Sequence, residues 1–197
     1  MTFRLGLTGS IGMGKSTTAK LFADAGCAVW DADAAVHRMY AKGGAAVAPL
    51  QEVLPDAIVD GAVSRDRLKA LIGKDASVLK LLEQIVHPLV GQDRANFVEE
   101  STADIVVFDI PLLFETGGNK SMDAVVCVSV SPEVQQKRVM ERGTMTLEQF
   151  EQIRAKQMPN EEKCAQSDFV VVTDTLEHAR EQVNDIVLKI RRDLSVA

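Results

Sequence analysis

The sequence predicts an α/β fold in which a five-stranded parallel sheet lies between two layers of helices. Short apolar runs alternate with amphipathic stretches, which is the pattern of strand–helix units in such a sheet. A glycine-rich turn joins the first apolar run to the first helical stretch. With 197 residues, 46% of them apolar, the chain is long enough to form one compact unit around a substantial core.

The first strand is expected over residues 3–8, and the turn after it reads Gly9-x-x-x-x-Gly14-Lys15-Ser16. This spacing fits the phosphate-binding P-loop without a substitution. Its glycines allow a tight turn in which successive backbone N–H groups surround a phosphate. Lys15 can then reach the β and γ oxygens of a nucleotide, and the Ser16 hydroxyl can ligate Mg²⁺. The helix expected over residues 16–25 directs its positive end at the same anion.

The second strand, expected over residues 27–30, ends at Asp31-Ala-Asp33. In open parallel sheets ligands bind beyond the carboxyl ends of the strands, so Asp31 and Asp33 are expected at the same edge as the P-loop. Asp33 also has a plainer interpretation as the N-cap of a helix that begins at Ala34. The two roles are compatible, and the position at the ligand edge favours function.

Residues 34–100 interrupt the alternation and predict a helical insertion that binds the substrate. One helix is expected around residues 36–40, and a second over 47–53 that ends near Pro55. A third is expected between a cap at Ser64 and a stop at Gly73. An apolar stripe over residues 78–86 is expected to end at His87-Pro88, before a further helix over 89–97.

The remaining strands are expected over residues 104–109, 124–129 and 168–172, followed by an amphipathic closing helix over 176–194. Asp109 ends the first of these strands, which gives it the form of a Walker B strand. Its carboxylate could hold Mg²⁺ directly or through water, or it could simply begin the next loop. Pro132 is expected to open a helix, because proline is tolerated in the first turn.

Residues 139–166 are polar and charged, and we interpret them as a lid over the nucleotide. The core is then residues 1–33, 101–138 and 167–197. Arg138 and Arg142, four residues apart, are the best candidates for neutralising the phosphate oxygens. The segment carries further cations at Arg154, Lys156 and Lys163. A solvated helical face is the alternative interpretation of these charges.

Composition narrows the function classes. The net charge is −6, which argues against non-specific binding to nucleic acid or to a membrane surface. Three cysteines without a CxxC spacing indicate reduced thiols in a reducing compartment. No signal peptide or membrane span is evident, so a cytoplasmic location is expected. We expect a monomer, with weak self-association left open.

Among P-loop proteins, a small kinase fits best. A GTPase switch would need Asn-Lys-x-Asp, whereas Asn119-Lys120-Ser121 is followed by Met122. A nucleotide-dependent regulatory protein would lack an acceptor base and a cationic lid, and this chain offers candidates for both. A nucleoside monophosphate kinase, or another small-metabolite kinase, remains the alternative.

Motifs along nearly the whole chain resemble the dephospho-CoA kinase family. They are Gly6-Leu-Thr-Gly-Ser-Ile-Gly-Met-Gly-Lys-Ser16, Asp31-Ala-Asp33, Arg65 with Leu68, Ile85-Val-His-Pro88, Ile110-Pro-Leu-Leu-Phe-Glu115, Arg138-x-x-x-Arg142, Gln157-Met-Pro with Glu162-Lys163, and Ser167-Asp-Phe-Val170. The Pro-Leu-Leu-Phe-Glu stretch and the His-Pro element are the specific ones, because the P-loop is shared by many kinases.

The resemblance implies phosphorylation of the ribose 3′-hydroxyl of dephospho-CoA by ATP with Mg²⁺. It makes Asp33 the base that accepts the hydroxyl proton, with Lys15, Arg138 and Arg142 also catalytic. The ATP-binding residues would be Gly12, Met13, Gly14, Lys15, Ser16 and Thr17. The substrate-binding residues would be Thr8, Asp31, Arg65, His87 and Glu115. The metal would be held by Ser16 and by Asp109. Asp109 would contact it either directly or through a water molecule.

Two positions depart from the family pattern. The family often has an asparagine near adenine after the fifth strand, where this chain has Val172-Thr173-Asp174. A contact from an asparagine side chain therefore cannot be carried over. Arg154 stands where the family commonly has an apolar residue, and it is either an additional lid cation or a solvated charge.

Overall fold

The computed structural model describes residues 2–196, which form two compact units. Residues 1–30 and 101–197 make up the sheet unit, and residues 31–100 make up the helical unit. Each unit is described by itself below.

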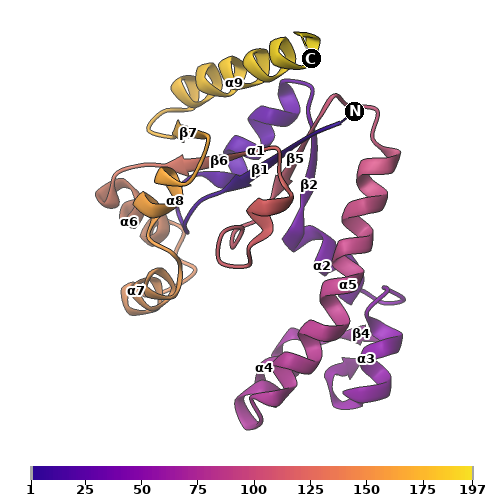
Figure 1. Cartoon of the computed structure of the whole chain (residues 1–197). Helices are drawn as coiled ribbons and strands as arrows, with labels where there is room; N and C mark the ends of the chain where they lie inside the picture. The colour runs from indigo at the N-terminus through magenta and orange to yellow at the C-terminus, as the bar shows by residue number, and fades with distance from the viewer. Residues whose placement is uncertain (1, 197) are drawn as a thin grey trace. The chain divides into compact units, whose positions relative to one another are not determined.

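The sheet unit is built on five strands in the order β2-β5-β1-β6-β7 (Figure 1). Their bounds are Ala28–Asp31 for β2, Ile105–Asp109 for β5, Phe3–Thr8 for β1, Ala124–Ser129 for β6 and Phe169–Val172 for β7. Central β1 pairs in parallel with both neighbours, so that Leu5 lies opposite Val107 on one side and Ala124 on the other. The five-stranded parallel sheet expected from the sequence is confirmed.

The strands are apolar because both faces of the sheet are covered. On one face, Leu5 and Leu7 pack in a core with side chains of α1 (Lys15–Asp24) and α9 (Leu176–Val196). On the other face, Leu113 lies so close to Gly6 that a Cβ on this glycine would be 2.7 Å from the leucine Cδ2. Both faces of β1 are therefore packed, as a central strand requires.

Three helices connect β6 to β7: α6 (Pro132–Glu141), α7 (Leu147–Lys156) and α8 (Asn160–Ala165). The expected start of α6 at Pro132 is confirmed, and the Ser131 side chain caps it by accepting from the Val134 N–H. A capping box at Thr146 and Gln149 fixes the start of α7. A short 3₁₀ turn, η2 (Gly118–Ser121), lies between β5 and β6.

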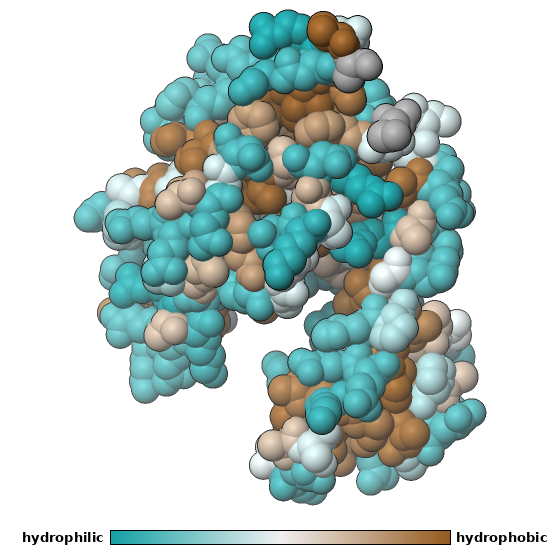
Figure 2. Space-filling view, viewed as in Figure 1, coloured by the Kyte–Doolittle hydropathy of each residue, from teal (hydrophilic) through white to brown (hydrophobic). Residues whose placement is uncertain are grey.

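The helical unit contains α2 (Ala32–Tyr40), α3 (Val47–Val53), η1 (Pro55–Ala57), α4 (Arg65–Lys74) and α5 (Ser77–Glu100). It also has a small antiparallel hairpin, β3 (Ile58–Val59) with β4 (Ala62–Val63), which the sequence patterns did not reveal. An ion pair of 2.9 Å between Arg38 and Asp93 joins α2 to α5. Figure 2 shows hydrophobic surface on this unit, whose exposed large apolar residues are Val53, Val59 and Leu79.

Two expected helix ends are wrong. Gly73 does not stop α4, which continues to Lys74. His87-Pro88 does not end a helix either, because α5 runs through Pro88 without interruption. Proline removes one backbone hydrogen bond from a helix interior and crowds the carbonyl four residues earlier. Helical residues continue for more than two turns on either side of Pro88, so the bonds of the flanking turns outweigh this local loss.

None of the helices within residues 2–196 is both long enough and apolar enough to cross a membrane. All three cysteines are free thiols, with Cys27 and Cys127 buried and Cys164 half-buried.

Candidate active site

The P-loop follows β1 directly and leads into α1, as the sequence predicted. Gly14 has a φ of +93°, which side chains rarely tolerate, and a Cβ there would lie 2.8 Å from the Thr173 Oγ1. Gly12 is similar, with a φ of +79° and the Val139 Cγ2 only 2.6 Å from the place of a Cβ. Glycine is therefore required at both positions by backbone conformation and by packing.

Lys15, Ser16 and Thr17 form the first turn of α1, where backbone N–H groups have no partner inside the helix. No acidic side chain lies in this turn, so the positive end of the helix dipole is not neutralised there. The turn and the loop before it offer an anion several N–H donors at one place.

The Lys15 ammonium contacts the Asp109 carboxylate at the carboxyl end of β5. Because β1 and β5 are neighbours, the loop after one strand and the last residue of the other meet at the same edge of the sheet. The side chain of Asp109 is 4% exposed and that of Lys15 is 17% exposed. A cation and a carboxylate are thus held together next to the P-loop.

Arg138 and Arg142 both line a small pocket beside the start of α1. The pocket has a volume of about 250 Å³ and is also lined by Gly14, Thr17 and Thr173. Arg138 donates hydrogen bonds to the backbone carbonyl and, at 3.0 Å, to the hydroxyl of Thr173. Thr173 is buried, and its hydroxyl also bonds the Met13 carbonyl at 2.7 Å. Thr173 therefore connects the P-loop to Arg138, a role that the sequence did not reveal.

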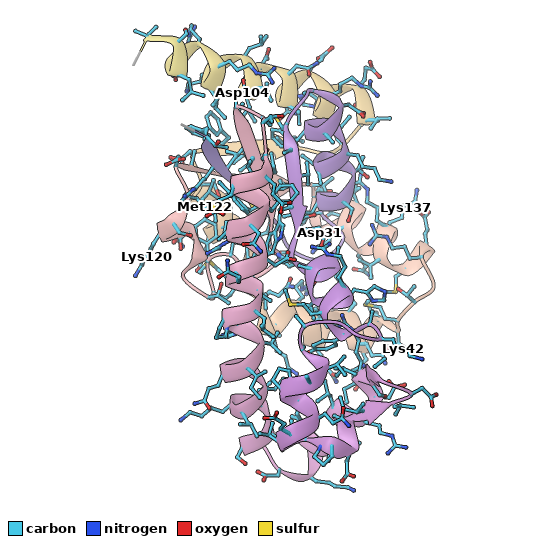
Figure 3. The ribbon with its side chains drawn as sticks, turned by 90° about the vertical axis from the view of Figure 1, so that its right-hand side faces the viewer. Asp31, Lys42, Asp104, Lys120, Met122 and Lys137 are labelled. Atoms are coloured by element: carbon cyan, nitrogen blue, oxygen red, sulfur yellow. The ribbon has the colours of Figure 1, made fainter. Side chains whose placement is uncertain are left out.

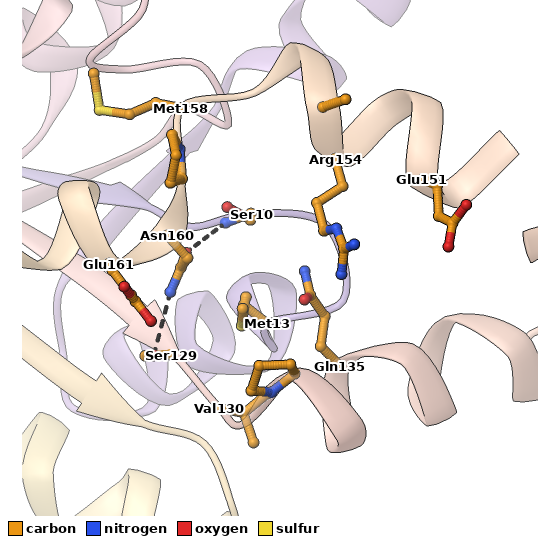
Figure 4. A pocket seen from close by; sticks show the side chains of 13 residues that line it. Ser10, Met13, Ser129, Val130, Gln135, Glu151, Arg154, Met158, Asn160 and Glu161 are labelled. Atoms are coloured by element: carbon orange, nitrogen blue, oxygen red, sulfur yellow. Dashed lines mark hydrogen bonds between the residues drawn. The ribbon is translucent and has the colours of Figure 1, made fainter. Parts of the chain in front are cut away.

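A larger pocket of about 750 Å³ lies on another side of the P-loop, with Ser10 and Met13 in its wall (Figure 4). Arg154 extends from α7 toward Gln135 in this pocket. Its guanidinium also lies 5.5 Å from the centre of the Phe150 ring. Arg154 therefore brings a positive charge near the P-loop, as a lid residue would, while its side chain remains exposed.

Thr8 and Glu115 are both tied to the segment after β5. The Thr8 hydroxyl donates to the Pro111 carbonyl at 3.1 Å, and Thr8 ends β1 as the plainer interpretation expected. Glu115 accepts a hydrogen bond of 3.0 Å from the Met158 N–H and forms an ion pair of 2.9 Å with Lys163. Burial favours the neutral acid, but the hydrogen bond from Lys163 and those from the backbone outweigh it and lower the pKa of the Glu115 carboxyl.

Lys163 is not one of the exposed cations that the sequence suggested. Its side chain is 0% exposed, and its ammonium donates to the Pro111 carbonyl at 3.1 Å as well as to Glu115. Lys163 is paired within the fold, so it is not a solvated lid charge. A charge-rich stretch cannot show which of its lysines faces inward.

Three amide side chains that the sequence did not single out contact the P-loop. Asn160 accepts from the Ser10 N–H at 3.1 Å, and Gln157 accepts from the Ile11 N–H at 3.2 Å. Gln135 donates to the Ile11 carbonyl at 2.7 Å. The only sequence signal was the Gln157-Met-Pro motif, which the resemblance included without giving it a role.

The predicted residues of the helical unit are exposed. The Asp31 side chain, labelled in Figure 3, accepts from the Ala34 N–H at 2.9 Å and caps α2. The interpretation of Asp33 as the cap is therefore wrong, because α2 begins at Ala32 and Asp33 lies in its exposed first turn. The Asp33 carboxylate in this turn also interacts favourably with the positive end of the helix dipole.

Arg65 and His87 likewise differ from their plainer interpretations. The Arg65 guanidinium lies 5.4 Å from the centre of the Tyr40 ring, so its contact is aromatic. Burial raises the pKa of the Tyr40 hydroxyl despite the nearby Arg65 charge. His87 is exposed on α5, so it is not a buried histidine.

Comparisons with known proteins identify the family. The profile of the dephospho-CoA kinase family matches residues 3–178. A dephospho-CoA kinase of Ruegeria pomeroyi is 72% identical over 191 residues, which cover 97% of each chain. A solved Thermus thermophilus protein superposes with a TM-score of 0.85 at 32% identity, covering 95% of this chain and 97% of that one.

A dephospho-CoA kinase from Campylobacter jejuni shares the fold, with a TM-score of 0.70 at 22% identity over 98% of this chain and 99% of its own. The profile match spans the P-loop, the helical unit and β7, so it covers every element that carries a predicted site residue. The chain therefore belongs to the dephospho-CoA kinase family.

Proposed function

We propose that this protein transfers the γ-phosphoryl group of ATP to the ribose 3′-hydroxyl of dephospho-CoA, giving coenzyme A and ADP. This is the last step of coenzyme A synthesis. Family membership supports the acceptor. The observation that carries the donor half is the P-loop, with Lys15 beside Asp109 at the ends of two neighbouring strands.

Lys15, Arg138 and Arg142 are proposed to neutralise the charge that develops on the transferring group. Phosphoryl transfer gains mostly from positioning and charge neutralisation, so these cations matter more than a base does. Lys15 contacts Asp109, and the phosphates of ATP would give its ammonium a second anionic partner. Arg138 and Arg142 already line a pocket with Gly14 of the P-loop and Thr17 of α1, where the nucleotide would bind.

Mg²⁺ is proposed to arrive with ATP and to be held by Ser16 and Asp109. A hydroxyl and a carboxylate are oxygen donors of the kind that Mg²⁺ prefers. Within residues 2–196 no group of three or more His, Cys, Asp or Glu side chains could hold a metal ion. Magnesium commonly uses one or two protein carboxylates plus substrate phosphates, which fits this donor set. When bound, the ion would neutralise charge on the phosphates.

The acceptor half is proposed from the family resemblance. Asp33 would take the proton of the ribose 3′-hydroxyl while the hydroxyl oxygen forms a bond to the γ-phosphorus. At the same time the bond between the γ-phosphorus and the oxygen that leaves with ADP would break. The exposed Asp33 carboxylate is free of the capping role that Asp31 fills. The proposed dephospho-CoA contacts are Thr8, Asp31, Arg65, His87 and Glu115.

The experiment is ADP release by the purified protein with Mg-ATP and dephospho-CoA, nucleoside monophosphates or no acceptor. We expect turnover with dephospho-CoA alone, and a product phosphorylated at the 3′ position by mass spectrometry and NMR. Lys15→Ala is the control, because it should bind ATP poorly and lose turnover. ADP formation that is independent of dephospho-CoA would overturn the proposal, and preference for a nucleoside monophosphate would support the alternative kinase.

Location and assembly are also proposed. Free thiols at all three cysteines support a reducing compartment such as the cytoplasm. We propose a monomer that associates weakly at most, which sedimentation at several concentrations would test.

A further inference from the structure

The backbone of the P-loop has two different sets of hydrogen-bonding groups. Within residues 2–196, no protein group accepts from the N–H of Gly12 or Gly14, so these donors remain for a phosphate. The polar groups of Ser10 and Ile11 are instead bonded to the protein itself. The Ser10 carbonyl accepts from the Met13 N–H at 3.2 Å, which closes the turn from inside.

Ile11 is held from both sides by amide side chains. Its N–H donates to the Gln157 Oε1 at 3.2 Å, and its carbonyl accepts from the Gln135 Nε2 at 2.7 Å. Gln135 comes from α6 and is 3% exposed, whereas Gln157 follows α7. The peptide groups on either side of Ile11 are therefore fixed by two elements that are distant from it in sequence.

Asn160 holds the preceding residue in the same manner. Its Oδ1 accepts from the Ser10 N–H, and its Nδ2 donates at 3.2 Å to the Ser129 hydroxyl (Figure 4). The same Nδ2 donates at 3.2 Å to the Val128 carbonyl. Asn160 thereby ties the first turn of the P-loop to the end of strand β6. Ser10 and Asn160 are 150 residues apart, so only the folded chain supplies this contact.

The segment that carries Gln157 and Asn160 is itself anchored. Lys163, one turn after Asn160, is fully buried and bonds the Pro111 carbonyl and Glu115. Glu115 also accepts from the Met158 N–H, which adjoins Gln157. Residues 157–163 are consequently fixed to the segment after β5 at two points and to the P-loop at two others.

We propose that Gln135, Gln157 and Asn160 are positioning residues, which set the P-loop conformation that leaves Gly12 and Gly14 N–H groups directed at phosphate. They act on the P-loop through the backbone of Ser10 and Ile11. Residues 157–163 are then a fixed support of the P-loop, and lid movement is confined to the part of the chain before them. The inference rests on the proposed kinase function.

Two substitutions test this with matched charge. Gln157→Glu and Gln135→Glu each replace an amide group beside Ile11 by a carboxylate of nearly the same size. A glutamate at 157 still accepts from the Ile11 N–H, but one at 135 faces the Ile11 carbonyl without a proton to donate. We expect Gln157→Glu to keep kcat/KM for ATP within about threefold of the parent, and Gln135→Glu to lower it by about tenfold or more.

A second comparison uses alanine substitutions that remove the hydrogen bonds to the backbone of Ile11 and Ser10. Gln157→Ala and Asn160→Ala should each lower kcat/KM for ATP by about fivefold or more, with the KM for dephospho-CoA unchanged. Calorimetric titration with a non-hydrolysable ATP analogue should show the same order of affinities without an acceptor. If Gln135→Glu does not fold, Gln135→Met removes the donor without adding charge and is expected to show the same loss.

Equal losses in Gln157→Glu and Gln135→Glu would mean that charge alone matters, and would overturn the inference. Parent-like kinetics in both alanine variants would overturn it as well. Failure of the proposed function is distinguishable, because the parent itself would then not phosphorylate dephospho-CoA, while analogue affinities would still order the variants.

Discussion

Replacing Lys163 by methionine should destabilise the protein strongly, although no charge is lost from its surface. The side chain is fully buried and donates to Glu115 at 2.9 Å and to the Pro111 carbonyl at 3.1 Å. Methionine has a similar length but no donor, so both acceptors lose their partner. Removing one member of a buried ion pair typically costs about 3–5 kcal/mol, because the other charge stays behind.

The expected cost here lies just below that range. Glu115 retains 21% side-chain exposure and the hydrogen bond from the Met158 N–H, so water and the backbone compensate part of the loss. We therefore expect Lys163→Met to lower the free energy of unfolding by about 2–3 kcal/mol. With a urea m-value of about 2 kcal/mol/M, the midpoint of urea unfolding at pH 7 should fall by about 1–1.5 M.

A double-mutant cycle separates the ion pair from other effects of the substitution. Glu115→Gln removes the carboxylate, so Lys163→Met should cost about 1 kcal/mol less in that background than in the parent. A coupling energy near zero, or a midpoint shift below about 0.5 M for Lys163→Met alone, would refute the assignment of Lys163 as a structural ion-pair partner.

The same pair has a defined pH dependence. The pKa of Glu115 in the folded protein is below its ordinary value of 4.5, so its ionised form contributes stability above that pH. That contribution is lost as the pH falls through the lower, folded-state pKa. The stability difference between the parent and Glu115→Gln should therefore be constant from pH 7 to about pH 5.5 and shrink below pH 4.5. A difference that already shrinks between pH 7 and 6 would contradict this.

Three further predictions concern the site and the thiols. Asp33→Asn should fold like the parent, since Asp31 provides the cap, while kcat falls by about a hundredfold or more; an unchanged kcat would remove the base assignment. Gly14→Ala should weaken ATP-analogue binding at least about tenfold in a titration, because its φ of +93° and the Thr173 Oγ1 at 2.8 Å exclude a methyl group; parent-like affinity would contradict this. With a thiol reagent at pH 8, half-buried Cys164 should react first, and Cys27, whose pKa burial raises to about 11, should react only on unfolding; prompt reaction of Cys27 would show that its burial is incomplete.

The strands and the P-loop could be predicted because their signals are local. An uninterrupted apolar run such as residues 105–108 is typical of a strand that is buried on both faces, and Asp109 marks its end. The P-loop spacing is a pattern of eight consecutive residues, so nothing distant is needed to identify it. The sequence identified Asp109 as the end of a strand of Walker B form, and in the structure its carboxylate contacts the Lys15 ammonium.

What the sequence could not provide is pairing between distant polar side chains. Lys163 and Arg154 are both cations in one polar stretch, yet one is fully buried and the other exposed. Gln135 and Gln157 have no local pattern, since their partner is a peptide group in the P-loop. The helix end expected at Pro88 failed because the hydrogen bonds of the flanking turns of α5 outweigh the local cost of the proline.

The strand order has a consequence for how the chain reaches its native state. β1 is made first, yet it lies at the centre of the sheet, with Phe3 opposite Ile105 and Leu5 opposite Ala124. Its neighbours leave the ribosome only after the entire helical unit has been synthesised. Until then an apolar strand followed by a glycine turn has no sheet to join, which is the situation in which nascent chains aggregate or need a chaperone. Nucleotide binding by nascent chains should accordingly begin only after β6, β7 and the residues that hold the loop have emerged.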